Sequence, residues 1–249
     1  MLEFKEVSFK YEGDKENILK NLNFSVKDGE FISIIGASGC GKSTLFRLIN
    51  GLEESIEGEI FVDNKRVEKG KNYSAYMPQK DLLFPWRTIG GNLSLPMELK
   101  GVSKPNREKR ICEILKDVDL LKYKDKYPKD LSGGMRQRAA FARTLITGSK
   151  LLLLDEPFSA LDSLTKISMQ EWLLSQWQNS SNTIMFITHD VEEAIFLSNY
   201  IYIIVDKPIT HLEKVKVPIN YPRNRDCLKS KEIIELKEEL ISKLRQKVD

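Results

Sequence analysis

The chain has 249 residues, of which 41% are hydrophobic and 30% charged, with 14 Gly and 9 Pro. This composition excludes a disordered tail, a collagen-like repeat and a small disulfide scaffold, and the length fits one large domain or a domain with a subdomain. The net charge of +3 comes from residues 206–249, which hold 11 Lys and Arg against 8 Asp and Glu. So small an excess forms no basic stripe, and we expect no nucleic-acid partner.

The longest apolar runs, residues 151–154 and 201–205, are too short to cross a bilayer, which takes about 20 residues in a helix. Charged residues interrupt the first ten positions, where a secretion signal has an apolar stretch, so we expect a cytoplasmic protein. Cys40, Cys112 and Cys227 fit neither a metal-ligand spacing nor a disulfide framework. We expect all three to be reduced thiols.

Alternating apolar residues near the N-terminus predict antiparallel strands. The alternation runs through residues 9–11 and 22–26. Residues 59–67 read as two short strands joined by a turn at Asp63-Asn64. The sequence therefore predicts an antiparallel sheet in this region.

Three further apolar runs, residues 31–35, 151–154 and 183–187, do not alternate. Continuous apolar runs are typical of parallel strands that are covered on both faces. Helical patterns separate the three runs, so the sequence predicts an α/β fold.

Residues 85–148 have a different, helical pattern. Apolar residues spaced i, i+3, i+4 and i+7 form one stripe among Lys and Glu, which predicts an amphipathic helix. The stripe consists of Ile111, Ile114, Leu115 and Val118. A second helix, rich in Ala and Arg, is predicted at about residues 134–146. We expect a helical subdomain inserted between strands of the main sheet.

A last amphipathic helix is predicted near the C-terminus, behind a linker that contains Pro218 and Pro222. Its apolar face is formed by Ile233, Leu236, Leu240, Leu244 and Val248. We expect this helix to cap the sheet, with a regulatory role as the alternative.

A glycine-rich motif follows the predicted strand at residues 31–35. Residues 36–43 read Gly-Ala-Ser-Gly-Cys-Gly-Lys-Ser and fit the pattern G-x-x-x-x-G-K-[ST]. Such a loop points backbone N–H groups at phosphate oxygens, Lys42 adds a positive charge for the β and γ phosphates, and Ser43 can hold Mg²⁺. The alternative is a glycine-rich turn with an exposed lysine. The strand before the motif and the helical pattern after it favour nucleotide binding.

Two carboxylates, Asp155 and Glu156, follow four apolar residues at the end of another predicted strand. Ligands of α/β sheets bind at the carboxyl ends of strands. Asp155 is suited to bind Mg²⁺, and Glu156 is suited to accept a proton from the attacking water as the P–O bond breaks. The alternative is a solvated strand end before Pro157.

A second anion cradle is predicted about 90 residues beyond the first. Residues 131–135 read Leu-Ser-Gly-Gly-Met and precede Arg-Gln-Arg, so Ser132 and the glycine amides stand at the start of a helix. Alone, Ser-Gly-Gly is most often a plain helix cap. Together with the first motif, it resembles the signature of the ATP-binding cassette (ABC) ATPases. In that family two chains pair head to tail, and each signature covers the γ-phosphate held by the other chain.

The resemblance covers nearly the whole chain, because further family elements occur in the right order. Tyr11 matches the aromatic residue that stacks on adenine, and Gln79 matches the glutamine that senses metal and γ-phosphate. Residues 159–162 match the loop between the paired sites, and His189 matches the switch histidine. Each has a plain alternative: Tyr11 as a core aromatic, Gln79 as a loop amide and His189 as a buried histidine.

The resemblance implies an α/β fold with a P-loop NTPase (RecA-like) core sheet, an N-terminal antiparallel β subdomain and an inserted α-helical subdomain. We expect residues 1–249 to form a single ABC ATPase domain. Residues 1–84 and 149–205 would form the nucleotide-binding core with the antiparallel subdomain, residues 85–148 the helical subdomain with the signature, and residues 206–249 the C-terminal linker and helix.

The family's site residues are carried over onto matching positions. The catalytic residues are Glu156, His189, Lys42 and Gln79. The nucleotide-binding residues are Tyr11, Gly36, Ala37, Ser38, Gly39, Cys40, Gly41, Lys42, Ser43, Thr44, Gln79, Ser132, Gly133, Gly134 and Asp162. The metal ligands are Ser43, Gln79 and Asp155.

One branch of the family, the nitrate, sulfonate and taurine importers, is the most similar. The signature with its Arg-Gln-Arg resembles that branch, and so do residues 82–86, close to its LLPW, and residues 222–225, close to its PRPR. Phe84 and Asn224 depart from these patterns. Met135 replaces the commoner signature Gln, and a thioether cannot make the hydrogen bonds of an amide.

The resemblance therefore implies the ATP-hydrolysing subunit of an importer for small organic or inorganic anions, with ATP and Mg²⁺ as cofactors. Its partners would be a second copy of the chain, two transmembrane permease subunits and, through the complex, an extracytoplasmic solute-binding protein. It would lie at the cytoplasmic face of the membrane, docked through the surface near Gln79 and residues 81–90. The alternative for the apolar residues of this segment is local packing of the subdomain.

Three alternative functions share some of these motifs. A mechanical ABC ATPase that regulates cell-envelope or lipoprotein machinery shares every core motif, and residues 82–86 and 222–225 argue against it. A chromosome or repair ATPase needs a long coiled-coil insertion, for which the chain has no room. A nonhydrolytic regulator is disfavoured because four residues suited to hydrolysis are all present: Lys42, Asp155, Glu156 and His189.

Overall fold

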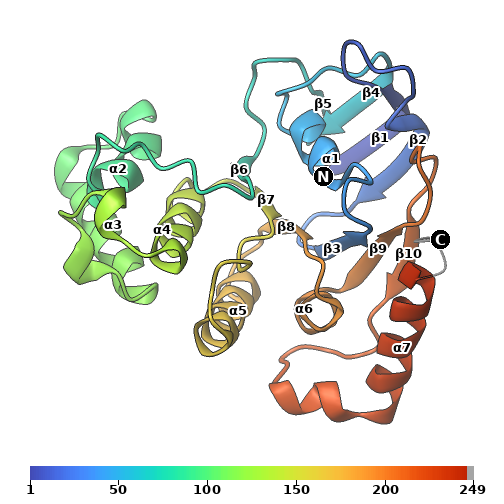
Figure 1. Cartoon of the computed structure of the whole chain (residues 1–249). Helices are drawn as coiled ribbons and strands as arrows, with labels where there is room; N and C mark the ends of the chain where they lie inside the picture. Colours follow the sequence, from blue (N-terminus) through green and yellow to red (C-terminus); the bar gives the residue numbers. More distant parts are fainter. Residues whose placement is uncertain (246–249) are drawn as a thin grey trace.

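The computed structural model describes residues 1–245 and has the predicted α/β fold, built around two sheets (Figure 1). The first sheet is antiparallel and has the strand order β2-β1-β4-β5. Its strands are β1 (Leu2–Phe9), β2 (Leu19–Val26), β4 (Glu57–Val62) and β5 (Lys65–Arg66). Asp63 and Asn64 have φ angles of 50° and 60°, which a two-residue hairpin turn of type I′ requires. The predicted hairpin is confirmed, whereas Tyr11 lies beyond the end of β1.

The second sheet has the order β10-β9-β3-β8-β7-β6 and is parallel except at its edge strand β10. The three apolar runs form β3 (Phe31–Gly36), β7 (Leu151–Asp155) and β8 (Thr183–Ile187), with almost every residue buried. The sheet is completed by β6 (Ala75–Met77), β9 (Tyr200–Ile204) and β10 (Glu213–Lys216). Burial on both faces explains why these strands do not alternate in sequence.

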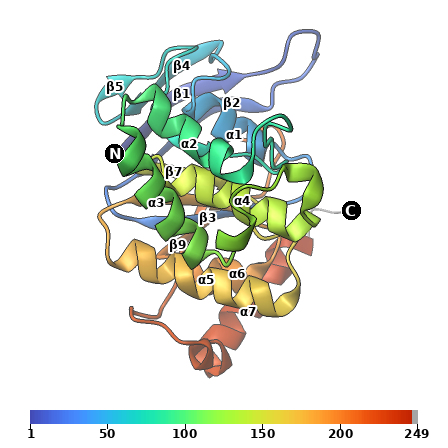
Figure 2. The same ribbon diagram turned by 90° about the vertical axis from the view of Figure 1, so that its left-hand side faces the viewer.

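Three helices, α2 (Ile89–Leu99), α3 (Lys104–Asp117) and α4 (Gly133–Leu145), lie together at one side of the parallel sheet (Figures 1 and 2). The predicted amphipathic helix is α3, which ends one residue before Val118. The predicted helix at residues 134–146 is α4, shifted by one residue. The division of the chain into subdomains stays a prediction.

The remaining helices are α1 (Lys42–Ile49), α5 (Ser163–Gln178), α6 (Val191–Leu197) and α7 (Lys231–Arg245), with short 3-10 turns η1 (Leu121–Tyr123), η2 (Pro128–Asp130) and η3 (Arg225–Lys229). Within residues 1–245, no helix is long and apolar enough to span a bilayer. In this part of the chain, all three cysteines are free.

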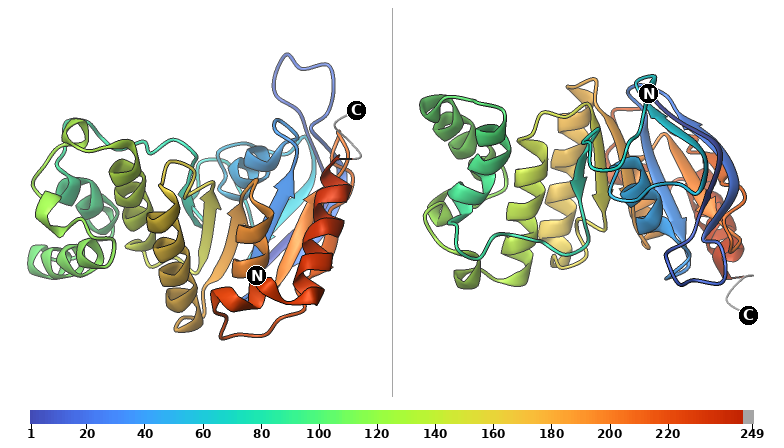
Figure 3. Two further views of the ribbon diagram at one scale, coloured as in Figure 1. Left: turned by 60° about the horizontal axis from the view of Figure 1, so that its bottom comes forward. Right: turned by 90° about the horizontal axis from the view of Figure 1, so that it is seen from above.

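Helix α7 packs at the end of the sheet away from α2, α3 and α4 (Figure 3). Its apolar face joins one buried cluster with Ile195 of α6 and Ile201 of β9. The helix contributes Ile233, Leu236 and Leu240 as buried residues and Leu244 as a half-buried one, whereas Val248 lies outside the described residues. These are the contacts of a capping helix.

Arg223, in the segment that resembles PRPR, binds the end of α6. Its guanidinium donates to the carbonyl oxygens of Ile195, Phe196 and Ser198 at 2.8 to 3.1 Å and to that of Ile219 at 2.7 Å. The last carbonyls of a helix have no partner within the helix, and a cation is favoured there. The motif therefore closes α6 against the C-terminal segment.

We expect Arg223→Ala to lower the free energy of unfolding by about 2–3 kcal/mol, because buried carbonyls lose a charged donor. Urea unfolding followed by circular dichroism measures the change. Lys229→Ala is the control, since its side chain is 80% exposed and should leave the midpoint unchanged. Equal midpoints for Arg223→Ala and Lys229→Ala would contradict the capping role.

Candidate nucleotide site

A cleft of about 540 Å³ lies where four neighbouring strands of the parallel sheet end. Gly36 ends β3, Asp155 ends β7, Gln79 follows β6 by two residues, and His189 follows β8 by two residues. The cleft is lined by Tyr11, Ile18, Gly36, Ser38, Gly39, Gly41, Lys42, Ser43, Thr44, Gln79, Asp155, Glu156 and His189. The structure thus brings together predicted residues from five distant segments. Ile18 was not predicted, because an isolated apolar residue carries no motif.

Residues 36–43 form a tight loop between β3 and α1, as the motif predicts. Gly41 has φ = 109°, and a Cβ atom there would lie 2.7 Å from Cγ2 of Ile18, so a side chain is excluded. The Nζ atom of Lys42 donates to the carbonyl oxygens of Gly36 and Ala37, each at 2.8 Å. The loop therefore curves around the lysine and places its charge at the N-terminus of α1, where anions bind.

Asp155 is buried beside this loop, at 3% exposure. Burial raises the pKa of Asp155, with a smaller contribution in the same direction from Glu156, while the Ser43 hydrogen bond and the Lys42 charge act against it. Oxygen ligands such as the Asp155 carboxylate and the Ser43 hydroxyl suit Mg²⁺. A divalent cation between them would favour the ionised carboxylate.

The carboxylate of Glu156 lies between two other predicted residues. Its Oε2 atom accepts from Nε2 of Gln79 at 3.0 Å, and its Oε1 atom is 3.5 Å from Nδ1 of His189. Glu156 has φ = 48°, a conformation that residues with side chains seldom adopt, and such residues cluster at functional sites. The side chain of His189 is 68% exposed, which excludes the alternative of a buried core histidine.

Tyr11 is half buried at the edge of the cleft. Its hydroxyl is 3.3 Å from Oγ1 of Thr44, and its ring makes an edge contact with Phe9 at a centroid distance of 5.0 Å. The Tyr11 side chain is therefore packed on one side and exposed on the other. Its hydroxyl lies beside Thr44, the residue that follows Lys42 and Ser43.

The residues beside His189 are anchored by a partly buried polar cluster that the sequence analysis did not predict. Thr188 donates to the carboxylate of Glu193, and Lys166 bonds both Glu193 and Asp190, the latter at 3.0 Å. Burial alone would lower the pKa of Lys166, but its bonds to Glu193 and Asp190 outweigh this and raise it. The cluster joins α5 to α6. The sequence did not reveal it because Lys166 is 24 or more positions away from Asp190 and Glu193, and no local motif links residues that far apart.

Comparison with known proteins assigns the chain to a family. A family model described as ABC transporter matches residues 19–159, more than half of the chain. The chain belongs to the ABC transporter family. This ABC ATPase therefore binds ATP. The predicted enzyme class, an ATPase, is confirmed by membership of this family.

Three curated relatives are import ATP-binding proteins, in line with the importer branch that the sequence resembles. The formylaminopyrimidine import protein ThiZ of Halalkalibacterium halodurans is 42% identical over 93% of this chain and 90% of its own. The aliphatic sulfonates import protein SsuB of Bacillus thuringiensis subsp. konkukian is 42% identical over 84% and 82%. The nitrate import protein NrtD of Synechocystis sp. is 42% identical over 86% and 79%.

Two similar solved structures are dimers of one ABC cassette, MJ0796. The post-hydrolysis dimer bound to ADP and Pi has a TM-score of 0.80 and 31% identity, and the match covers 88% of this chain and 100% of that chain. A second dimeric structure of this bacterial ABC transporter cassette has a TM-score of 0.79 and 30% identity over the same shares. The predicted fold class is therefore confirmed.

Some predicted nucleotide contacts of this ABC ATPase lie outside the cleft of their own chain. Ser132, Gly133 and Gly134 stand at the start of α4, and Ser132 caps that helix by accepting from the Met135 amide at 3.3 Å. Asp162 caps α5 by accepting from the Thr165 amide at 3.0 Å. Ala37 and Cys40 line a neighbouring cavity of about 370 Å³. Ser132 and Gly133 are exposed and Gly134 is half buried at the helix N-terminus, where a second copy can reach them.

Met135 is partly buried against the apolar cluster of α4. Because the cap bond uses the backbone amide of Met135, we expect Met135→Gln to change ATP turnover by less than about 2-fold. A phosphate-release assay on both proteins measures the ratio. A large loss would show that the thioether itself contributes to the site.

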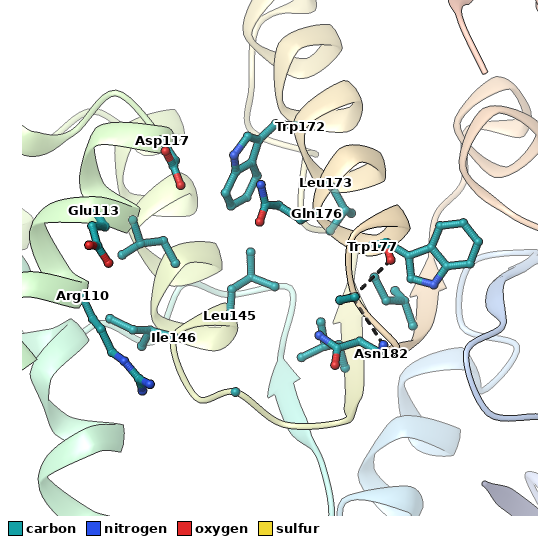
Figure 4. A pocket seen from close by; sticks show the side chains of 15 residues that line it. Arg110, Glu113, Asp117, Leu145, Ile146, Trp172, Leu173, Gln176, Trp177 and Asn182 are labelled. Atoms are coloured by element: carbon teal, nitrogen blue, oxygen red, sulfur yellow. Dashed lines mark hydrogen bonds between the residues drawn. The ribbon is translucent and has the colours of Figure 1, made fainter. Parts of the chain in front are cut away.

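A further cavity of about 380 Å³ lies between α3, the end of α4 and α5 (Figure 4). Trp172 and Trp177 of α5 line it, together with Arg110 and Glu113 of α3. It contains none of the predicted site residues.

Proposed function

We propose that the cleft is the ATP-hydrolysis site of this chain. Lys42 would hold the β and γ phosphates, and Ser43, Asp155 and Gln79 would hold Mg²⁺, which neutralises charge that develops on the phosphates. Glu156 would accept the proton of the attacking water. The arrangement that supports this assignment is the Glu156 carboxylate, placed between the Gln79 amide and the His189 ring.

The remaining roles follow from position. Tyr11 would stack on adenine at the edge of the cleft, and His189 would contact the γ-phosphate. Ser132, Gly133 and Gly134 of a second copy would cover the γ-phosphate, and Asp162 would lie in the loop between the two sites. The dimeric form of the similar cassettes supports this pairing.

We further propose that the chain is the ATP-hydrolysing subunit of an importer for small solutes, at the cytoplasmic face of the membrane. Its partners would be two permease subunits and, through the complex, an extracytoplasmic solute-binding protein. The observation that carries this proposal is that relatives covering most of the chain are import proteins. By their names, these relatives import a formylaminopyrimidine, aliphatic sulfonates and nitrate, all at 42% identity. We therefore propose a small solute, of the nitrate, sulfonate and taurine type that the sequence resembles, and name no single one. The alternative of a mechanical cell-envelope ATPase gains no support from them.

The segment after Gln79 supports the docking of a permease. Leu82 and Trp86 are 59% and 72% exposed, whereas Leu83 between them is buried. Local packing, the alternative for this segment, therefore accounts for Leu83. It leaves Leu82 and Trp86 largely exposed, although the Trp86 ring contacts Phe84 at a centroid distance of 5.2 Å. Exposed aromatic residues on a fixed backbone are typical of binding hot spots.

The backbone of this segment is fixed from both sides. The fully buried Asn92 donates to the carbonyl oxygens of Phe84, Arg87 and Thr88, at 3.0 to 3.2 Å. From the signature helix α4, Arg143 donates to the carbonyl oxygen of Leu82 at 2.8 Å. A partner bound at Trp86 would therefore be joined to the signature through hydrogen bonds rather than through a loose loop.

Transport by cells that carry Trp86→Ala in place of the wild-type chain tests the importer proposal. We expect uptake of one solute of the class to be lost, while the purified chain hydrolyses ATP within about 2-fold of wild type, because Trp86 lies outside the cleft. The control is a strain that lacks the chain altogether. If that strain takes up every solute of the class as the wild-type strain does, the importer proposal is wrong.

A further inference from the structure

Gln137 of α4 is a buried polar residue whose side chain reaches the catalytic segment. It is 5% exposed, and its face of the helix, three, four and seven residues on, is formed by the buried Ala140, Phe141 and Thr144. A buried amide is costly unless its hydrogen bonds are made. The hydrogen-bond partners of the Gln137 side chain therefore explain why an amide occurs on a buried, largely apolar helix face.

All the partners of Gln137 lie in residues 156–160. Its Nε2 atom donates to the carbonyl oxygen of Glu156 at 3.1 Å and to Oγ of Ser159 at 3.0 Å. Its Oε1 atom accepts from the amide of Ala160 at 2.8 Å. Both ends of the amide are thus used, which fixes the orientation of the side chain.

The backbone of Glu156 needs such support. A positive φ at a residue with a side chain persists only where the surroundings hold it. The Glu156 amide donates to the carbonyl oxygen of Ile187 at 3.0 Å, and its carbonyl oxygen accepts from the amide and hydroxyl of Ser159 and from Gln137. Gln137 is the donor in this set that comes from the signature helix.

The start of α4 also packs directly on the same segment. A Cβ atom at Gly134 would lie 3.1 Å from the carbonyl oxygen of Ala160, so the helix and residues 159–162 touch through their backbones. Gln137 stands one turn further along the helix. The signature helix and residues 156–160 are therefore joined by a close backbone contact at Ala160 and by three hydrogen bonds, one of which reaches the Glu156 carbonyl oxygen.

We propose that Gln137 is a positioning residue for ATP hydrolysis. By holding the backbone of Glu156, it fixes the carboxylate beside Gln79 and His189 and ties that position to the signature helix. A signature that moves on binding the partner's nucleotide then moves the Glu156 backbone with it. This inference rests on the role proposed for Glu156.

The test is the steady-state kinetics of Gln137→Met, which keeps the length of the side chain and removes the amide. We expect kcat for ATP hydrolysis to fall about 10- to 100-fold, since a misplaced catalytic group costs rate on that scale. The KM for ATP should change by less than about 2-fold, because Gln137 touches no part of the P-loop. An unchanged kcat, or a higher KM at unchanged kcat, would overturn the proposal.

Thr144→Val is the matched control on the same helix. Thr144 is equally buried, but its hydroxyl donates to the carbonyl oxygen of Ala140 within α4. It should lower the melting temperature and leave kcat unchanged. If Gln137→Met does not fold, Ser159→Ala removes a donor to the same Glu156 carbonyl oxygen and should lower kcat in the same way.

A double-mutant cycle separates this role from a general effect on the dimer. In a Glu156→Gln background, Gln137→Met should lower the residual hydrolysis no further, because Gln137 acts through Glu156. A further loss of the same size in that background would overturn the proposal. If Glu156→Gln alone leaves turnover at the wild-type rate, the role of Glu156 fails instead, which is a distinct outcome.

Discussion

Glu156→Gln is expected to bind ATP as the wild-type chain does, to lose ATP turnover by about 10²- to 10⁴-fold, and to accumulate as a dimer with ATP and Mg²⁺. The loss is the size that removal of a general base produces. The amide keeps the shape of the side chain and can still meet Gln79, so the cleft should stay intact. Phosphate release measures turnover, fluorescent-nucleotide titration measures binding, and size-exclusion chromatography measures the dimer.

The control for this variant is Glu57→Gln, a change of the same kind at an exposed position of β4. It should leave turnover, binding and oligomeric state unchanged. Turnover by Glu156→Gln at the wild-type rate would remove Glu156 from the chemistry. Loss of ATP binding would show that Glu156 serves the fold of the cleft rather than the proton transfer.

Ser132→Arg is expected to lower turnover by about 100-fold or more while each chain still binds ATP. Ser132 is exposed and lies outside the cleft of its own chain, so an arginine there fits without disturbing the P-loop. It would block contact with the partner's γ-phosphate, and loss of one such anion-stabilising contact costs about 10²–10³ in rate. Titration with a fluorescent ATP analogue and a turnover assay measure the two effects separately.

Mixing Ser132→Arg with Lys42→Ala makes the same prediction sharper. We expect each variant alone to be nearly inactive, but a mixed dimer keeps one intact pair, the P-loop of the first chain with the signature of the second. Random pairing should restore about one quarter of wild-type turnover, because half the dimers are mixed and each holds one intact site. A mixture no more active than its parents would show that the signature acts within its own chain.

Sequence patterns predicted best those features that depend on local chemistry. The loop at residues 36–43 was recognisable because a backbone phosphate cradle demands glycine where φ is positive, as at Gly41. The strands β3, β7 and β8 were recognisable because burial on both faces requires continuous apolar runs. Their carboxyl ends then placed Asp155 and His189 at one edge of the sheet.

Features that depend on contacts between distant segments were not predicted. The helix α2 contains Pro96 and two glycines, so its local propensity is poor, and it forms because Thr88 caps it and Leu93 is fully buried. The sequence pointed to Gln137 only as part of the Arg-Gln-Arg stretch, because its partners lie about 20 residues further on. Tyr11 was placed by an alternating pattern that continues past the end of β1.

The most direct test of the composite site is a structure of Glu156→Gln crystallised with ATP and Mg²⁺. We expect a symmetric dimer in which Ser132 and the Gly134 amide of one copy lie about 3 Å from the γ-phosphate bound at Lys42 of the other. A γ-phosphate covered only by residues of its own chain, with residues 131–134 remote from it in every symmetric pair, would contradict the account.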